Sequence, residues 1–180
     1  MRRYIYDQEK KWFFRIEPFL YGKVLKVGSG LGYMTSFVRE RHPDLKILEI
    51  EINKDDKNKN RTVLYDGNHF PFSNKIFDCS ICTYVLHHTP NPVGLILEMK
   101  RVSRRLIVLE ETYRGVFSKM DLCYRDIYVN TLAGQPSRIF WNSYFQDKEL
   151  LKVLKGMDLE IIHSQKEKKR TYFKILYVLE

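Results

Sequence analysis

The sequence predicts a single α/β domain whose sheet is mostly parallel, with helices on both faces and an antiparallel hairpin near the C-terminus. Apolar, strand-like runs alternate with helical patterns along the 180 residues, an order that is typical of a parallel sheet. The run from Phe77 to Leu86 is continuously apolar, as expected of a central strand covered on both faces. By contrast, Leu159 to Glu180 holds two strand-like segments around a charged turn, which predicts the hairpin.

The first third of the chain begins with a helical pattern and continues with short strands. The spacing of aromatic and apolar residues predicts an amphipathic N-terminal helix within residues 1–21. Strands are expected at Lys23 to Val27, Leu45 to Ile52, and Thr62 to Tyr65. A helix is expected between the first two strands, at Leu31 to Glu40. Because a helical crossover usually takes about a dozen residues or more, Lys54 to Asn60 is predicted to hold no full helix.

The rest of the chain continues the alternation after the central strand. A helix is expected at Asn91 to Ser103, and a fifth strand at Arg105 to Glu111. Residues 112–145 mix aromatic residues with a helical pattern and are interpreted as one helix plus a loop that caps a ligand site. Another helix at Asp147 to Met157 leads into the hairpin. We therefore treat residues 1–180 as one domain.

Composition narrows the classes of protein. The net charge of +9 permits binding to nucleic acid or anionic surfaces without establishing it. The chain has three cysteines, an odd and low number that does not indicate a set of disulfide bonds. This number is typical of a protein in the reducing cytoplasm. No apolar stretch approaches the roughly 20 residues of a membrane span, and the N-terminus does not have the pattern of a signal peptide. The sequence thus predicts a cytoplasmic protein without a membrane span, either a monomer or a homodimer.

A glycine-rich turn lies between the first strand and the following helix. Gly28, Gly30 and Gly32 form a G-x-G-x-G pattern, which permits a tight turn and close approach of a ligand to the backbone. The helix N-terminus adds amide donors and partial positive charge. The spacing differs from the dinucleotide-binding fingerprint, and the lysine and Ser/Thr of a phosphate-binding loop are absent. A plain strand-to-helix turn is the alternative interpretation.

Two acidic residues end the next two strands. Glu51 ends the second strand, where a carboxylate can accept both hydroxyls of a ribose. Asp66 and Gly67 end the third strand, where a carboxylate and a backbone amide can bind an adenine. Taken singly, Glu51 is equally well an exposed strand-end acid and Asp66 a turn aspartate. Their joint placement at carboxyl ends of consecutive strands indicates a nucleoside site.

The segments VLKVGSGLGYMTSFV, LEIEIN, DGNHFPFSNKIFDCSICTYVLHHTPNP and EMKRVSRRLIVLE resemble the motifs of class I S-adenosylmethionine-dependent methyltransferases. The closest resemblance is to the small-molecule group that includes the ubiquinone and menaquinone biosynthesis enzymes. It implies a Rossmann-like, seven-stranded sheet whose last strand is antiparallel. It also implies S-adenosylmethionine as cofactor and S-adenosylhomocysteine as product. The implied cofactor-binding residues are Gly28, Ser29, Gly30 and Gly32 for the methionine part, Glu51 for the ribose, Asp66 and Gly67 for the adenine, and Thr83 and Tyr84 beside the methionine and sulfonium. Ile52, next to Glu51, is a further implied cofactor-binding residue.

Lys26 departs from the family pattern, which usually has an acid there that helps to hold the cofactor's ammonium group. A lysine reverses the sign of the charge, which costs about 1 kcal/mol in a solvated site. If the usual cofactor binds, we expect Lys26 to point away from that ammonium or to pair with a carboxylate such as Glu110 or Glu111.

The remaining candidates are histidines and cysteines around the fourth strand. His87 and His88 follow this strand. His88 is the candidate general base and His87 is interpreted as structural, although methyl transfer can proceed by proximity and orientation alone. Cys79 and Cys82 are three apart on a strand and therefore face opposite sides. They are interpreted as core thiols, and the sequence predicts no metal site.

The sequence therefore predicts a methyltransferase that uses S-adenosylmethionine and a small-molecule acceptor. The aromatic residues of 112–145 suit an apolar or aromatic acceptor, although core packing explains them equally well. The missing Asn/Asp-Pro-Pro-Tyr/Phe motif argues against DNA adenine and glutamine as acceptors. Two alternatives stay open. One is a binding module with the same fold and little or no catalysis, and the other is an RNA methyltransferase, which only the charge suggests.

Overall fold

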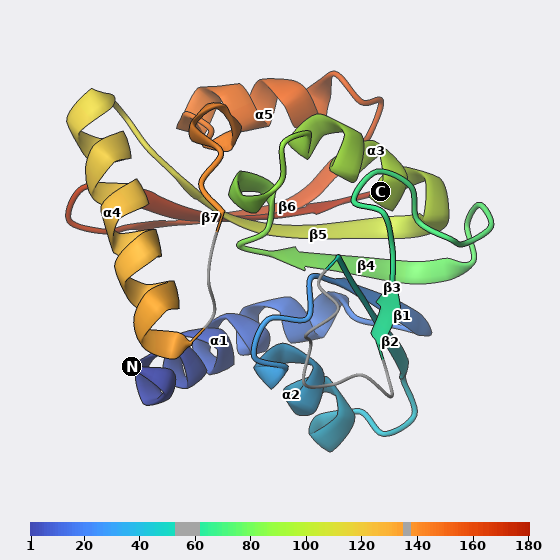
Figure 1. Cartoon of the computed structure of the whole chain (residues 1–180). Coiled ribbons are helices and arrows are strands. Elements are labelled where there is room, and N and C mark those ends of the chain that lie inside the picture. Colours follow the sequence, from blue (N-terminus) through green and yellow to red (C-terminus); the bar gives the residue numbers. More distant parts are fainter. Residues whose placement is uncertain (53–61, 135–137) are drawn as a thin grey trace.

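The protein is built around one seven-stranded sheet, seen edge-on in Figure 1. The computed structural model describes residues 1–52, 62–134 and 138–180. The strand order is β3-β2-β1-β4-β5-β7-β6. Strands β1 to β5 pair in parallel, whereas β7 is antiparallel to both β5 and β6. The predicted fold class is confirmed, including the antiparallel C-terminal hairpin.

The strands alternate with helices in the predicted order. The strands are β1 (Lys23–Val27), β2 (Lys46–Glu51), β3 (Thr62–Leu64), β4 (Phe77–Thr83), β5 (Ser103–Thr112), β6 (Ile161–Lys168) and β7 (Phe173–Leu179). The helices are α1 (Arg2–Ile16), α2 (Tyr33–Arg41), α3 (Pro92–Val102), α4 (Val116–Ala133) and α5 (Asp147–Lys155). Short 3-10 helices are η1 (Glu17–Phe19), η2 (Leu86–His88) and η3 (Trp141–Ser143).

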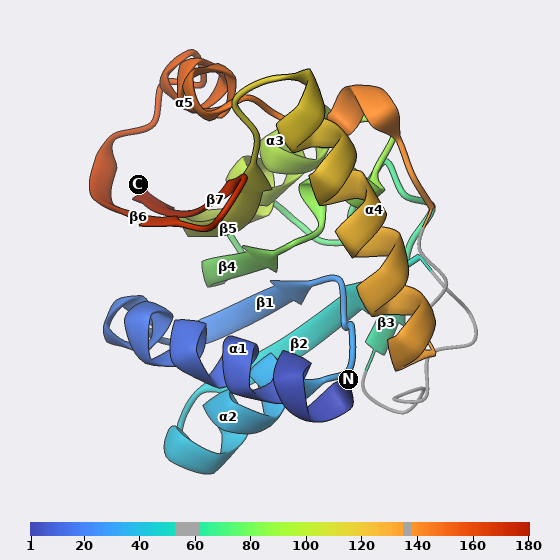
Figure 2. The ribbon, with the colours of Figure 1, turned by 90° about the vertical axis from the view of Figure 1, so that its left-hand side faces the viewer.

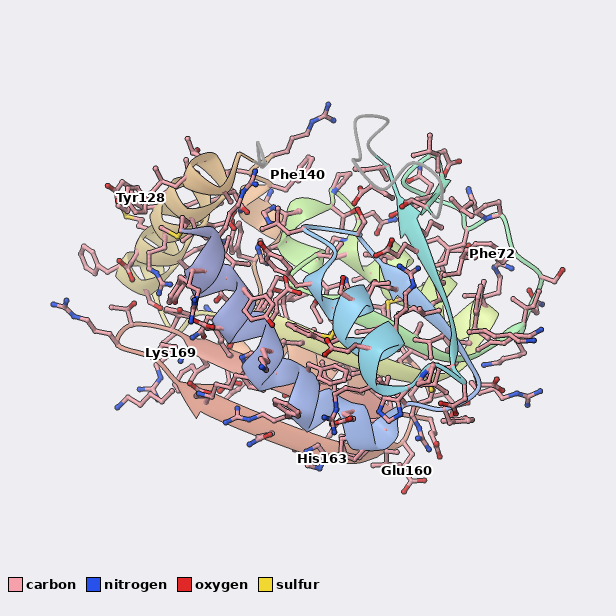
Figure 3. The ribbon with its side chains drawn as sticks, turned by 90° about the horizontal axis from the view of Figure 1, so that it is seen from below. Phe72, Tyr128, Phe140, Glu160, His163 and Lys169 are labelled. Atoms are coloured by element: carbon pink, nitrogen blue, oxygen red, sulfur yellow. The ribbon has the colours of Figure 1, made fainter. Side chains whose placement is uncertain are left out.

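Helices cover both faces of the sheet. Figures 1 and 2 show α1 and α2 on one face and α3 and α5 on the other, and Figure 3 shows α1 and α2 side by side. Each helix pair buries its own apolar cluster against the sheet. Cys79 belongs to the cluster under α1 and α2, and Cys82 to the one under α3 and α5. Burial raises the pKa of Cys82 to about 12, which agrees with their interpretation as core thiols on opposite faces.

Helix α4 has a different setting. It crosses the edge at which the parallel strands end (Figure 2), and Leu122 and Cys123 pack into a small cluster of their own. Much of its remaining apolar surface is exposed, including Phe117 and Tyr128, and Tyr128 points outward in Figure 3. Among the described residues of 112–145, α4 is followed by the short helix η3, and the role of this segment as a cap stays a prediction.

Some boundaries differ from those expected. Helix α2 begins at Tyr33 rather than Leu31, because Gly30 and Gly32 have positive φ angles and keep the turn out of the helix. Strand β6 runs on to Lys168, into the charged stretch that was expected to be a turn. The expectation for Lys54 to Asn60 lies outside the described residues. Among the described helices, none is long and apolar enough to cross a membrane.

Candidate cofactor site

The glycine loop closes tightly around the end of β1. Gly28, Gly30 and Gly32 have φ angles of 71°, 54° and 76°, a region that favours glycine. A Cβ on Gly28 would lie 2.7 Å from the Val85 side chain, whereas one on Gly30 would meet nothing within 4 Å. Gly28 is therefore needed for close packing against the segment after β4, and Gly30 for the backbone turn alone.

The Glu51 carboxylate connects the end of β2 to this loop. Its Oε2 accepts a hydrogen bond from the Ser29 N–H (3.0 Å) and lies 3.3 Å from the Ser29 hydroxyl. Its Oε1 accepts from the Ile52 N–H (2.7 Å). The predicted residues Ser29, Glu51 and Ile52 thus lie together, with the acid oriented by two backbone amides.

The end of β3 lies beside the end of β2. A Cβ on Gly67 would lie 3.6 Å from Ile52, so these two predicted residues are neighbours. Asp66 Oδ1 accepts from the backbone N–H groups of Asn68 and His69, each at 2.7 Å. These bonds lower the pKa of Asp66, with the one from His69 contributing most. Asp66 therefore stabilises a turn, which was its alternative interpretation. This turn lies next to the predicted adenine position.

Lys26 is almost fully buried at the end of β1. Its Nζ donates to the backbone carbonyl oxygens of Val27 (2.9 Å) and Gly28 (2.6 Å). The expected pairing with Glu110 or Glu111 is wrong, because Glu110 bonds to His87 and Glu111 to Lys174 instead. Strand alternation explains this result for Glu110, which lies on the face of Leu106 and Val108, opposite to Lys26. Glu111 shares the face of Lys26 but is ion-paired with Lys174.

Two other acids lie near Lys26. Glu9 comes from α1, and its Oε2 accepts from the Met34 N–H at the start of α2 (3.1 Å). Glu49 is buried on β2 and is the strand-register partner of Lys26. Burial lowers the pKa of Lys26, and attraction to Glu9 and Glu49 acts against this. Burial likewise raises the pKa of Glu9, against the effect of Lys26. Charged groups of opposite sign therefore influence one another near the end of β1.

The end of β4 contributes Thr83 and Tyr84. Thr83 is buried, and Tyr84 has a φ of 55°, a conformation that costs about 1 kcal/mol or more for a residue other than glycine. The buried Tyr84 hydroxyl has no hydrogen-bond partner in the described part of the chain. Burial raises its pKa well above the ordinary value, and Glu111 and Glu9 act in the same direction. A neutral hydroxyl thus lies near Glu9 without an assigned partner.

His87 and His88 form η2 directly after this strand end. His87 is buried, with Nδ1 2.6 Å from Glu110 Oε1 and its ring stacked on Tyr144. His88 is partly exposed, and both Nε2 atoms face Asp126 of α4. Burial acts to lower the pKa of His87, but the acidic neighbours Glu110 and Asp126 outweigh it and raise that pKa well above its ordinary value.

The sequence did not single out Glu9, Glu49 or Asp126 as site residues. The charges of Glu49 and Lys26 within apolar strands were a usable signal, since buried charged groups are generally paired. Glu9 and Asp126 lie on helices among other charged residues, so nothing in their local pattern distinguished them.

The strand order with β7 antiparallel, together with a glycine loop after β1, defines a class I methyltransferase fold. Residues 25–106 match the sequence profile of a family described as a methyltransferase domain. No curated protein matches the chain significantly.

Solved structures show the same fold at low sequence identity. A SAM-dependent methyltransferase from Methanosarcina mazei is 16% identical, with a TM-score of 0.67 over 91% of this chain and 95% of that one. Geranyl diphosphate methyltransferase in complex with SAM is 10% identical, with a TM-score of 0.70 over 97% and 84%. The cyclase SpnF is 14% identical, with a TM-score of 0.68 over 94% and 79%. The resemblance to class I methyltransferases is confirmed, and the narrower one to quinone biosynthesis enzymes stays a prediction.

Proposed function

We propose that this protein is an S-adenosylmethionine-dependent methyltransferase that acts on a small-molecule acceptor. The observation that carries the proposal is the Glu51 carboxylate, which is held against the Ser29 N–H at the carboxyl end of β2. Open α/β sheets bind ligands at this edge, and a fixed carboxylate there is suited to two ribose hydroxyls. The match to a methyltransferase domain supports the assignment.

The residues present fit the nucleoside part of the cofactor. Glu51 would accept from the ribose hydroxyls, while Ile52 and Gly67, which lie next to each other, would border the adenine together with Asp66. A glycine at position 67, with a φ of 88°, leaves room for close approach of a planar base.

The methionine part would lie against the glycine loop and the end of β4. Its carboxylate and ammonium would meet a group that contains Lys26, Glu9 and the Tyr84 hydroxyl, which has no hydrogen-bond partner among the described residues. We assign Glu9 the role of the acid that is missing from the end of β1, since it carries a carboxylate near Lys26 at the start of α2. When bound, the cofactor supplies an electrophilic methyl group on sulfur.

The acceptor would lie beneath α4, and this chain's own contribution is to position it. Methyl transfer from a sulfonium needs alignment and exclusion of water more than a base. Tyr113, Tyr144 and Trp141 lie around this region and suit an apolar or aromatic acceptor. The catalytic role of His88 stays a prediction. So do the cytoplasmic location and the choice between monomer and homodimer.

A binding module without turnover is the second candidate, and Lys26 favours it. The Lys26 ammonium already donates to the Gly28 carbonyl at 2.6 Å, so a ligand ammonium near this oxygen would be repelled. The SpnF structure, which is named as a cyclase, illustrates that one fold hosts different reactions. An RNA acceptor has no comparable observation in its favour among the described residues.

Titration calorimetry with S-adenosylmethionine and S-adenosylhomocysteine tests the proposal. The wild type should bind both, and Glu51→Ala should bind at least about tenfold more weakly, because two hydrogen bonds to a charged acceptor are lost. Glu160→Ala, an exposed acid far from the loop in Figure 3, is the matched control and should bind normally.

The outcomes separate the two candidates. Binding followed by transfer of a labelled methyl group to an acceptor supports the enzyme. Binding without transfer to any member of a panel of apolar and aromatic acceptors supports the module. Equal affinity of the wild type and a folded Glu51→Ala variant would remove the ribose assignment.

A further inference from the structure

Three potential metal ligands converge where η2 meets α4. His87 Nε2 lies 3.6 Å from Asp126 Oδ1, and His88 Nε2 lies 3.4 Å from the same oxygen. One potential ligand atom from each of the three residues lies within 4.8 Å of those of the other two. His87 is buried and the other two side chains are 26% and 9% exposed. The group is therefore enclosed, with its more open side at His88.

The partners of the two Nδ1 atoms determine what the Nε2 atoms can do. His87 Nδ1 lies 2.6 Å from a carboxylate oxygen of Glu110, and His88 Nδ1 lies 3.3 Å from the backbone carbonyl oxygen of Arg138. A carboxylate and a carbonyl oxygen only accept, so both Nδ1 atoms donate. In neutral rings both Nε2 atoms are then unprotonated, and each directs a lone pair toward Asp126.

Other contacts fix the carboxylates around this group. Glu110 accepts from the backbone N–H groups of Leu86 (2.9 Å) and Glu111 (2.8 Å). Asp126 accepts from the Asn130 amide (2.7 Å) and the Tyr144 hydroxyl (3.2 Å). When the rings are unprotonated, three electron-pair donors therefore face one another, and either a proton or a metal ion among them makes the arrangement favourable.

The distances favour a metal ion over shared protons. A protonated histidine bonded to a carboxylate has an N···O distance of about 2.7–2.9 Å, shorter than either separation here. Two atoms bound to one ion at about 2.0–2.1 Å with tetrahedral geometry lie about 3.3–3.4 Å apart. The separations of 3.4 and 3.6 Å are close to that value.

We propose that His87, His88 and Asp126 bind a divalent transition metal ion such as zinc. Two imidazoles and one carboxylate suit zinc better than magnesium or calcium, which prefer oxygen ligands. Glu110 is the outer carboxylate that orients His87, an arrangement common among metal-binding histidines. The ion would tie α4 to the end of β4 and keep a fourth position for water or an oxygen of a ligand. The site does not depend on methyl transfer.

The test measures metal binding on the untagged full-length chain after removal of metals with a chelator. Addition of Co²⁺ should produce the visible absorption of a tetrahedral complex, saturating at one equivalent, and Zn²⁺ should abolish it by displacement. Zn²⁺ should also raise the melting temperature by several degrees, because it binds only the folded state.

Two variants and a control make the result specific. His88→Ala and Asp126→Asn should each weaken Co²⁺ binding by about a hundredfold or more, since each removes a ligand or its charge. His88 is partly exposed, so its loss should leave the fold intact by circular dichroism. His163→Ala, on β6 and away from α4 in Figure 3, should bind as the wild type does.

The contrary result is equally clear. No Co²⁺ absorption, or binding that is the same in the wild type and both variants, would overturn the proposal and leave a proton-linked network only. Neither measurement uses S-adenosylmethionine, so failure here is distinct from failure of the proposed activity.

Discussion

The ends of β1 and β2 lie side by side, yet they present opposite charges to the glycine loop. At β2, the Glu51 carboxylate accepts from the Ser29 N–H. At β1, the Lys26 ammonium donates to the carbonyl oxygens of Val27 and Gly28. A ligand that brings hydroxyl donors complements Glu51, whereas one that brings an ammonium group competes with Lys26. The two ends therefore differ in how readily they accept the two parts of the same cofactor.

The largest expected effect comes from Lys26→Asp. The new carboxylate would be buried near two carbonyl oxygens and the acids Glu9 and Glu49. An uncompensated buried charge costs about 3–5 kcal/mol, and we expect a loss of that size in the free energy of unfolding, measured with urea. Lys26→Met, which removes the charge without adding an acid, should lose less.

A second substitution checks the cause. If repulsion is responsible, Lys26→Asp combined with Glu9→Gln should recover part of the lost stability. If Lys26→Asp alone has the same free energy of unfolding as the wild type, the new carboxylate is solvated and the burial argument is contradicted.

The next effect compares two glycines of the loop. Alanine at Gly30 meets no atom within 4 Å and should cost about 1 kcal/mol through its positive φ alone. Alanine at Gly28 would also press on Val85 at 2.7 Å, and overpacking typically adds about 1–3 kcal/mol. Urea unfolding of both variants gives the difference. In a Val85→Ala background, the stability lost through Gly28→Ala should become smaller, whereas the stability lost through Gly30→Ala should not change. Equal losses for the two glycine substitutions in the wild-type background would contradict the packing argument.

The smallest effect is a dependence of stability on pH at β1. Because the folded-state pKa of Lys26 lies below its ordinary value of 10.5, the unfolded chain binds more protons between those two values. Stability should therefore rise with pH across that window, by at most about 1.4 kcal/mol per pH unit. We expect the free energy of unfolding of the wild type to rise relative to that of Lys26→Met as the pH approaches 10.5 from below. Tyrosine titration affects both proteins and cancels in the difference; parallel curves would mean that Lys26 titrates normally.

The sequence predicted the backbone elements that form the site, but it did not predict which residues lie next to the charged side chains. Strand β1 has the predicted bounds, Lys23–Val27, because an apolar run ending at a glycine leaves little choice of register. Glu51 lies against the loop because parallel strands end at the same edge. Lys26 donates to carbonyl oxygens of its own segment, while the acids near it come from β2 and α1 and depend on which face of the sheet each helix covers.

Strand β6 shows a second limit of local patterns. Charged residues were taken as a turn, yet they continue the strand to Lys168, and alternate side chains along it are exposed. An edge strand tolerates charges on its outer side and is even protected by them against unwanted pairing. Likewise, the group of His87, His88 and Asp126 joins segments that are far apart in the sequence, so neither segment alone indicated a metal.

The position of β7 has a consequence for how the chain folds. It follows β6 in the sequence but lies between β5 and β6 in the sheet, and pairs Leu106 with Leu179. Strand β6 therefore joins the sheet only through β7, so neither strand can be added before the last residues of the chain have been made. Contacts of such long sequence separation form slowly. In the interval β5 is an open edge, and that is when a newly made chain is most exposed to pairing with another copy.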